Sequence, residues 1–434
     1  MISGQLKEGV ILSSVSGNKY IVHKLLGAGG QGEVYEVERN GKHFALKWYH
    51  KHMATPNQKR ILENLISKGK PDDSFLWPED LICPERGTSF GYIMQLRPSN
   101  FKSIVDLMKR KAEPSFYDLC KAAFNLTKGY QKLHEIGYSY RDISFGNVFF
   151  DPETGDVLIC DNDNVSVNGC DDSAVYGTPR FMAPEIVQGK AKPSRNTDLY
   201  SLSVLLFYML MMNHPLDGRL EANIRCMDIF AMNKLYGTDP VFIFDPNNNT
   251  NRPVIGYQDN AIIYWPLYPQ KIRDLFIQAF TVGLTTPNRR VTENRWLDAF
   301  ADLMAGIMIC PHCGAEVFYD SYKIANGEKH ICWGCNKVQA IPDVLSFEKH
   351  KIVLNDETKI VSHLIYNDKD VDTIIGSVVH NPNKPELIGV KNEDKVKWVY
   401  KKADGTEIVL DVGRSAAINK GAKILIQNMI GVIE

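Results

Sequence analysis

The sequence predicts an α+β fold with two unlike lobes, followed by a small cysteine module and an all-β tail. Residues 19–97 form short strand-like runs with one helical interruption, whereas residues 103–135 and 196–306 carry apolar side chains at helical spacing. Beyond residue 342, strand and turn signals recur without long helical periodicity. At 434 residues the chain is long enough for two to three domains of ~100–200 residues each.

The order of these signals sets the expected domain boundaries. Pro98 follows the last strand-like run of the first lobe and begins a Pro-Ser-Asn connection to the helical lobe. Short strands and a turn at 403–405 predict a small sandwich or barrel in the tail. The four expected parts are residues 1–97, 98–306, 307–342 and 343–434.

Composition and charge narrow the class of protein. A formal net charge of −1 gives no electrostatic reason to expect binding to nucleic acid or to a membrane. The most apolar run, 199–212, is shorter than the ~20 residues of a membrane-spanning helix, so we expect a helix buried in a core. The N-terminus lacks a signal-peptide pattern and the scattered cysteines suit a reducing compartment, which together predict a cytoplasmic protein.

Three glycines, Gly27, Gly29 and Gly32, stand at G-x-G-x-x-G spacing. Such a turn can close over phosphate oxygens because no Cβ stands in the way. The same pattern marks dinucleotide-binding folds, but there a helix follows, whereas residues 33–38 alternate like a strand. Lys47 lies on the next predicted strand and can reach the same phosphates as a point charge. The sequence therefore predicts a glycine-rich lid over a nucleotide.

Carboxylates and an amide suited to group transfer follow further along the chain. Asp142 and Asn147 are five residues apart in a predicted loop, and Asp161 ends an apolar strand. A carboxylate such as Asp142 can accept a proton from an attacking hydroxyl, while amide and carboxylate oxygens suit a magnesium ion. Glu63 lies in a helical stretch and could hold Lys47 by an ion pair; the alternative is a solvated glutamate on an amphipathic helix.

The segment 177–185, Gly-Thr-Pro-Arg-Phe-Met-Ala-Pro-Glu, completes a set of ordered motifs. With them, residues 15–306 resemble a eukaryotic-type protein kinase domain. The resemblance implies Mg²⁺-dependent transfer of the ATP γ-phosphoryl group to a protein hydroxyl. It favours serine and threonine substrates, because the alanine and arginine typical of tyrosine kinases are absent near Ser144 and Gly146.

The resemblance also assigns roles to individual residues. The catalytic set is Asp142, Lys47, Asn147 and Asp161. Nucleotide contacts are implied for a larger set: Gly27, Gly29, Gly32, Val34, Ala45, Lys47, Glu63, Met94, Asn147 and Asp161. Magnesium would be held by Asn147 and Asp161. The resemblance further implies that Asp198 anchors the catalytic loop and that Arg290 pairs with Glu185 as a structural contact.

The chain departs from the family pattern at four positions. Tyr140 replaces the usual histidine, and Ser144 replaces a lysine that would neutralise γ-phosphate charge. Asn162 and Asp163 stand where the family has phenylalanine and glycine, and for Asp163 we weigh a second magnesium ligand against a turn-capping role. These departures leave a pseudokinase that binds nucleotide as a scaffold as the alternative to an active enzyme.

Phosphorylation of the activation segment is a further expectation, since Arg141 precedes Asp142 and could pair with a phosphate. The candidate acceptors are Ser166, Ser173 and Tyr176.

Two Cys-x-x-Cys pairs, separated by 18 residues, form the cysteine module. The four cysteines are Cys310, Cys313, Cys332 and Cys335. This spacing predicts a tetrahedral structural Zn²⁺ site, and Gly314 and Gly334 permit the tight turns that it needs. The module has no basic face, so contact with a partner protein is preferred to nucleic-acid binding.

The tail resembles a forkhead-associated-type sandwich, although it lacks the Ser-Arg-x-x-His pattern that reads phosphothreonine. Trp398 and Tyr400 are expected to be core or hairpin aromatics rather than parts of a ligand site. The whole arrangement resembles bacterial eukaryotic-like serine/threonine kinases that carry a zinc ribbon and a β tail, a group associated with stress-response and tellurite-resistance-type gene clusters. The segments 242–253 and 264–269 support that subgroup.

Overall fold

The computed structural model describes residues 4–84, 87–169 and 177–434. The N-terminal lobe is a six-stranded antiparallel sheet in the order β1-β2-β3-β4-β6-β5. Its strands are β1 (Ile11–Ser13), β2 (Lys19–Ala28), β3 (Gly32–Arg39), β4 (Lys42–Tyr49), β5 (Asp80–Ile82) and β6 (Gly91–Gln95).

Helix α1 (Pro56–Lys68) is the helical interruption in this lobe. It begins where the Thr55 side chain accepts a hydrogen bond from the Gln58 N–H and Pro56 takes the first position, which needs no donor. It ends at Gly69, whose φ of 76° lies in the left-handed region.

The C-terminal lobe is helical and surrounds α5, which is buried along almost its whole length. Its helices are α2 (Ile104–Met108), α3 (Phe116–Glu135), α4 (Pro184–Val187), α5 (Arg195–Met211), α6 (Arg219–Ala222), α7 (Ile229–Asn233), α8 (Asp259–Tyr264), α9 (Gln270–Phe280), α10 (Val282–Thr285) and α11 (Glu293–Ala305). Short strands flank the loops that carry Asp142, Asn147 and Asp161: β7 (Lys102–Ser103), β8 (Tyr138–Ser139), β9 (Val148–Phe150), β10 (Val157–Ile159) and β11 (Ser166–Val167). The expectation of a buried helix over 199–212 is met by α5.

A small module and two sheets follow the helical lobe. The module contains β12 (Ile307–Ile309), β13 (Glu316–Phe318) and α12 (Ser321–Ala325). The first sheet of the tail has the order β15-β14-β23-β22-β19-β20 and the second β16-β17-β18-β21. Their strands are β14 (Val344–Ser346), β15 (Lys351–Val353), β16 (Lys359–Val361), β17 (Ile374–Asn381), β18 (Lys384–Asn392), β19 (Trp398–Lys401), β20 (Glu407–Leu410), β21 (Ser415–Ala417), β22 (Lys423–Ile426) and β23 (Met429–Ile433).

The tail also contains one short helix, α13 (His363–Tyr366), which the sequence reading missed. Its two sheets meet around buried aromatic side chains, as expected: Trp398 lies against Gly376 of the other sheet, and the Tyr400 hydroxyl donates to the Ala417 carbonyl at 2.9 Å.

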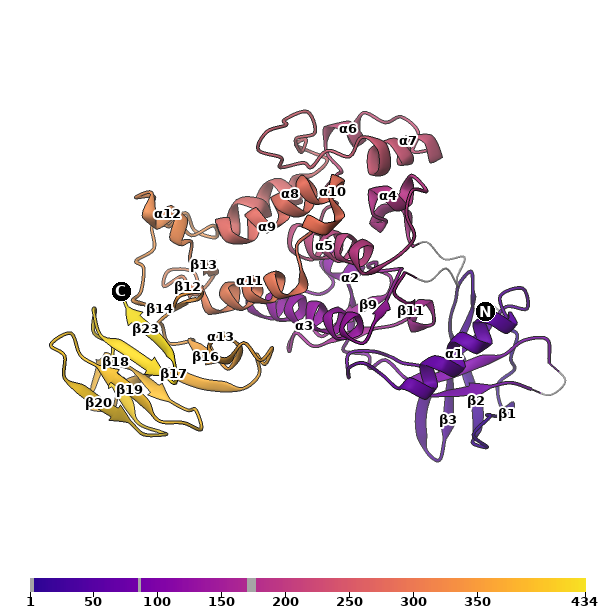
Figure 1. The fold of residues 1–434 in the computed structure, drawn as a ribbon, viewed down its shortest axis with the longest axis horizontal. Coiled ribbons are helices and arrows are strands. Elements are labelled where there is room, and N and C mark those ends of the chain that lie inside the picture. The colour runs from indigo at the N-terminus through magenta and orange to yellow at the C-terminus, as the bar shows by residue number, and fades with distance from the viewer. Residues whose placement is uncertain (1–3, 85–86, 170–176) are drawn as a thin grey trace.

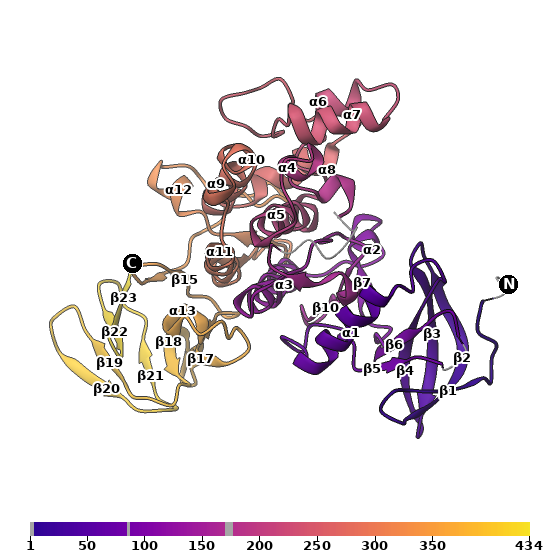
Figure 2. The ribbon, with the colours of Figure 1, turned by 45° about the vertical axis from the view of Figure 1, so that its right-hand side comes forward.

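The N-terminal lobe and the tail lie at opposite ends of the C-terminal lobe (Figures 1 and 2). One apolar cluster runs from the C-terminal lobe into the tail, where α11 packs against β15 and α13. The C-terminal lobe and the tail therefore share one apolar interior, and the division of the chain into four parts stays a prediction. Among the described residues, none of the helices has the length and hydropathy needed to cross a membrane.

Candidate active site

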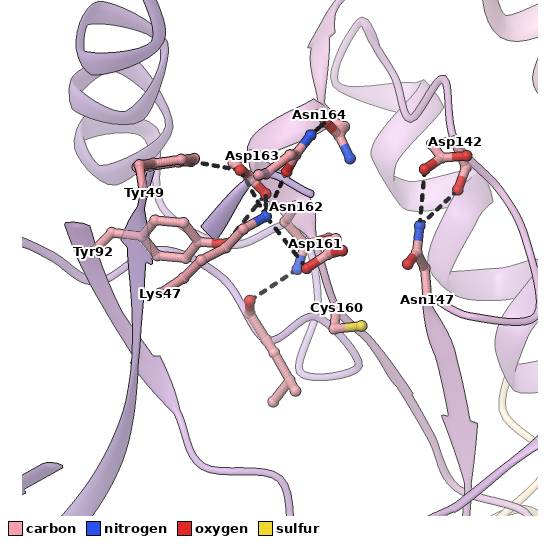
Figure 3. A network of polar contacts seen from close by, with 12 residues as sticks. Lys47, Tyr49, Tyr92, Asp142, Asn147, Cys160, Asp161, Asn162, Asp163 and Asn164 are labelled. Atoms are coloured by element: carbon pink, nitrogen blue, oxygen red, sulfur yellow. Dashed lines mark hydrogen bonds and ion pairs between the residues drawn. The ribbon is translucent and has the colours of Figure 1, made fainter. Parts of the chain in front are cut away.

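Lys47 lies buried on β4 between the sheet and the segment after β10. Its Nζ donates to both carboxylate oxygens of Asp163, at 2.9 and 3.0 Å, and lies 3.5 Å from Oδ1 of Asp161 (Figure 3). Burial alone would lower the pKa of Lys47, but these two carboxylates outweigh it and raise the pKa above its ordinary value. The lysine is therefore a buried positive charge held between the sheet and this segment.

Glu63 does not hold Lys47, so that expectation is wrong. Its side chain is half exposed on α1, 3.8 Å from Lys59 Nζ. The buried positions of α1 are Leu62 and Leu65, and each step along a helix turns the side chain by about 100°. Glu63, directly after Leu62, therefore points away from the sheet, and its predicted contact with nucleotide has no geometric support.

Asp163 takes neither of the two roles weighed for it. Its carboxylate is enclosed by the lysine and two phenols: the Tyr49 hydroxyl donates to Oδ2 at 2.5 Å and the Tyr92 hydroxyl to Oδ1 at 3.2 Å. Its main-chain carbonyl accepts from Gln58 Nε2 of α1 at 3.2 Å. Both carboxylate oxygens are thus engaged within the protein, in a position facing Lys47.

Asn162 and Tyr140, the polar replacements, bind the backbone around this segment. Asn162 is fully buried, and its Nδ2 donates to the carbonyls of Leu76 and Ile159 at 2.9 and 3.0 Å. The Tyr140 hydroxyl donates to the Cys160 carbonyl, and the ring packs edge-on against Tyr130. Hydrogen bonds from these two side chains therefore fix the backbone of this segment.

Asp161 itself adopts a φ of 53°, a left-handed conformation that is uncommon outside glycine and concentrates at functional sites. Burial raises its pKa, while Lys47 lowers it and the charges of Asp163 and Asp142 raise it. Its side chain is 39% exposed, so one face remains open to a ligand.

The catalytic loop holds Asp142 from two sides. Asn147 Nδ2 donates to the main-chain carbonyl of Asp142 at 2.9 Å and to its Oδ2 at 3.3 Å, and Thr178 Oγ1 donates to Oδ1 at 2.7 Å. The Cys160 N–H donates to the Asn147 carbonyl, which ties this loop to the strand that carries Asp161. In Figure 3 the Asn147 amide oxygen faces the side on which Asp161 lies, so this pair fits a magnesium ion by donor type.

Two predicted anchors are confirmed by their contacts. The Asp198 carboxylate on α5 accepts the main-chain N–H groups of Tyr140 and Arg141 at 2.6 and 3.0 Å. Arg290 donates to both oxygens of Glu185 at 2.8 and 2.7 Å. Asp198 and Arg290 are buried and Glu185 is mostly buried, as expected for structural contacts.

His134, near the end of α3, also holds Asp198, a contact that the sequence analysis does not predict. Its Nε2 lies 3.1 Å from Asp198 Oδ2, and its Nδ1 lies 2.6 Å from Glu293 Oε1 on α11. Burial would lower its pKa, but the two carboxylates raise it to about 8.

The glycine loop carries its three glycines for different reasons. Gly27 and Gly29 are exposed with open space around them, whereas a Cβ on Gly32 would collide with the Trp48 carbonyl of β4. Gln31, which the sequence reading passed over, reaches the cleft: its Oε1 accepts from Lys47 Nζ at 2.8 Å.

Three further residues of the predicted nucleotide site lie together in the sheet. Val34 pairs with Lys47 across β3 and β4, and Ala45 pairs with Met94 across β4 and β6. Their nucleotide contacts stay a prediction.

Of the three candidate phosphorylation sites, the structure describes only Ser166. Ser166 is buried in β11, paired with Ser139 of β8, which argues against it as an accessible acceptor. Ser173 and Tyr176 lie outside the described residues.

The four cysteines converge on one point. Their sulfur atoms all lie within 4.8 Å of one another, with Cys310 and Cys335 Sγ 3.7 Å apart and Cys313 and Cys332 Sγ 3.6 Å apart. Tetrahedral zinc with Zn–S bonds of ~2.3 Å requires sulfur separations near 3.8 Å, so the group fits a structural Zn²⁺.

The turns of the two knuckles differ from the expectation. Gly314 has a φ of 74°, as predicted, but the matching turn after Cys335 uses Asn336 at 57°. Gly334 instead leaves room beside the sulfurs, since a Cβ there would lie 3.4 Å from Cys313 Sγ.

The family model of the protein kinase domain matches residues 20–292. The chain therefore belongs to the protein kinase family, and this match covers the glycine loop, Lys47 and the catalytic loop described above.

Several serine/threonine kinases are related to it. The chain is 30% identical to protein kinase C delta type of Homo sapiens over 227 residues, which is 50% of this chain and 32% of that protein. It is 28% identical to the probable serine/threonine-protein kinase CCRP1 of Zea mays over 207 residues, 46% of this chain and 32% of the relative. It is 24% identical to the cell cycle serine/threonine-protein kinase CDC5/MSD2 of Saccharomyces cerevisiae over 239 residues, 52% and 33%. The chain thus covers about a third of the length of these curated relatives.

Proposed function

We propose that this chain is an active serine/threonine protein kinase that transfers the γ-phosphoryl group of ATP to a protein hydroxyl. The observation that carries the proposal is the arrangement of Asp142, with Asn147 and Thr178 holding one oxygen each. A carboxylate oriented in this way can accept the hydroxyl proton of a substrate.

The remaining groups supply charge. Magnesium, held by Asp161 and Asn147, would neutralise phosphate charge. Lys47 places a permanent cation beside Asp161, and the glycine loop brings main-chain N–H groups over the nucleotide. Ser144 offers only a hydroxyl where the family has a cation, so we expect a slow enzyme.

The rival proposal is a scaffold that binds nucleotide without transferring phosphate. We test the two with the purified 434-residue chain, Mg²⁺, γ-labelled ATP and generic Ser/Thr substrates, beside Asp142→Asn. Label that appears with the wild type and disappears with the variant supports the enzyme. Equal nucleotide affinity of both proteins without any incorporation supports the scaffold.

We further propose that the cysteine module contacts a partner protein, in line with a role in bacterial stress signalling. Exposed apolar side chains gather around the second knuckle and support a protein surface: Ile331, Trp333, Val338 and Ile341. A test is whether charged substitutions at Ile331 and Val338 abolish co-purification with partners while label incorporation persists. We also treat the tail as an accessory β-sandwich; its forkhead-associated likeness stays a prediction.

A further inference from the structure

We infer that Asp163 is the positioning residue for Lys47, taking over the task that a glutamate of the helix next to the sheet would perform. The inference rests on the nucleotide-binding part of the proposed function, since it concerns how the same site holds its nucleotide. It assigns the holding carboxylate to the segment after β10, two residues beyond Asp161.

The first support is the geometry around the lysine. Lys47 Nζ is bound bidentately by Asp163, at 2.9 and 3.0 Å, and more distantly by Asp161, at 3.5 Å. Both Lys47 and Asp163 side chains are almost fully buried, with exposures of 5% and 1%. In such a site the attraction between the charges is strong, and removal of one partner leaves an uncompensated charge.

The second support comes from helix α1. The described residues of α1 that face the sheet and the cleft are apolar, Leu62 and Leu65, or neutral, Gln58. Its one acidic side chain, Glu63, points to solvent and contacts Lys59. The helix therefore presents no carboxylate to Lys47.

The third support is the way in which Asp163 is itself oriented. Tyr49 stands two residues after Lys47 on β4, so both side chains lie on one face of the strand. Its hydroxyl and that of Tyr92 donate to the two oxygens of Asp163, and Gln58 fixes the main chain of the same residue. A carboxylate held by three elements suits a positioning role better than a mobile metal ligand.

One consequence distinguishes this arrangement. Asp161 lies directly before the turn Asn162–Asn164, and Asp163 lies within it. One segment of the chain therefore positions both Lys47 and the proposed magnesium ligand. Helix α1 reaches this turn through Gln58, whose Nε2 donates to the Asp163 main-chain carbonyl.

The test uses the full chain and measures nucleotide affinity with a fluorescent ATP analogue, together with kcat and KM for ATP. Asp163→Asn keeps the shape but removes the charge, and we expect a tenfold or greater loss of affinity and of kcat/KM for ATP. The matched control is Glu63→Gln, for which both quantities should stay within twofold of the wild type. A loss of affinity with Glu63→Gln equal to that with Asp163→Asn would overturn the inference.

A relocated carboxylate separates positioning from a general structural role. Asp163→Gly alone should lose affinity, and the double variant Asp163→Gly/Gln58→Glu should regain at least tenfold, because Gln58 already lies beside the same turn. Asp163→Asn in a Lys47→Met background should have no further effect on affinity, since its action passes through the lysine. An equal loss in both backgrounds would contradict the inference.

Melting curves recorded on every variant identify unfolding. Affinity is read without phosphoryl transfer, so a chain that binds nucleotide by way of Asp163 yet never incorporates label would refute the proposed enzyme and leave this inference standing.

Discussion

Gln31 of the glycine loop and Lys47 of β4 are joined by a hydrogen bond of 2.8 Å, with the amide oxygen of Gln31 as the acceptor. The Gln31 Nε2 also donates to Asn164 Oδ1 at 3.3 Å, so this one side chain links the loop to the turn on the other side of the cleft. The loop is thereby closed onto the cation that phosphates would need.

We expect a bound nucleotide to displace Gln31 from Lys47, because the phosphates and the amide oxygen compete for the same ammonium group. We therefore expect Gln31→Ala to tighten ATP binding by up to about tenfold, since a hydrogen bond to a charged group contributes ~1.5–3 kcal/mol and part of this competes with phosphate. Gln31→Glu should weaken binding, because its carboxylate pairs with Lys47 and repels phosphate. Isothermal titration calorimetry checks both; weaker binding by Gln31→Ala would show that the amide contacts the nucleotide itself.

His134 should make stability depend on pH. Its pKa is raised to about 8 from an ordinary 6.5 by Asp198 and Glu293, so its contribution is complete below pH 6.5 and is lost as the pH rises through 8. The shift corresponds to about 2 kcal/mol. Urea unfolding of wild type and His134→Gln should therefore differ more at pH 6 than at pH 9. His52→Gln, at an exposed position of the N-terminal lobe, serves as the control.

Glu293 makes stability depend on pH in the acidic range. Its pKa is lowered to about 2, against burial, by His134 and Arg195, so its contribution is present above about pH 4.5 and disappears as the pH falls towards 2. The His134–Glu293 contact should thus stabilise the protein most between about pH 4.5 and 6.5. A difference between wild type and His134→Gln that stays constant from pH 6 to 9 would contradict this assignment.

Substitution of Arg290 should strongly destabilise the fold. Its guanidinium is buried, binds Glu185 with two hydrogen bonds, and also donates to the carbonyls of Asn196 and Gly283. Breaking a buried pair costs ~3–5 kcal/mol, so Arg290→Ala should lower the free energy of unfolding by about that amount. Arg290→Lys should recover part of it, since it keeps the charge but not the fork.

An exposed pair provides the comparison. Lys397 lies 2.9 Å from Asp411 with both side chains mostly exposed, and such pairs are worth ~0–1 kcal/mol. Lys397→Ala should accordingly change the unfolding free energy little. Equal costs at Arg290 and Lys397 would refute the structural role of the buried pair.

Zinc should be present at about one ion per chain and should stabilise the fold. The module is fastened to α3, because Glu316 accepts the Phe116 N–H at the start of that helix and Trp333 Nε1 donates to the Glu316 carbonyl at 2.8 Å. Chelation or Cys313→Ser should lower the melting temperature and change Trp fluorescence. Metal analysis and thermal melting test this, with the exposed Cys226→Ser as the control that keeps its metal.

Sequence spacing predicts the residues of the site that belong to motifs with fixed separations along the chain. Lys47, Asp142, Asn147 and Asp161 were all found by sequence distance from glycines or from each other, and the four cysteines likewise converge as their spacing predicts.

Contacts that depend on which way a side chain points around a helix axis could not be predicted from the sequence. Whether Glu63 or Gln58 of α1 faces the lysine depends on helix phase, where one residue changes the direction by about 100°. The partner of Asp163 follows from a strand and a turn that are distant in sequence. The alternation of Lys47 and Tyr49 on β4 was a signal that could have revealed a polar cluster on one strand face.

Helix α11 lies beyond the matched family region, which ends at residue 292, and it carries Trp296 and Phe300 into the same interior that the tail sheets complete. A shortened chain that stops at the end of the matched region would leave that interior open to water. Biochemical work on this protein therefore requires the tail to be present, and deletion of the tail is an unsuitable way to ask what the tail does.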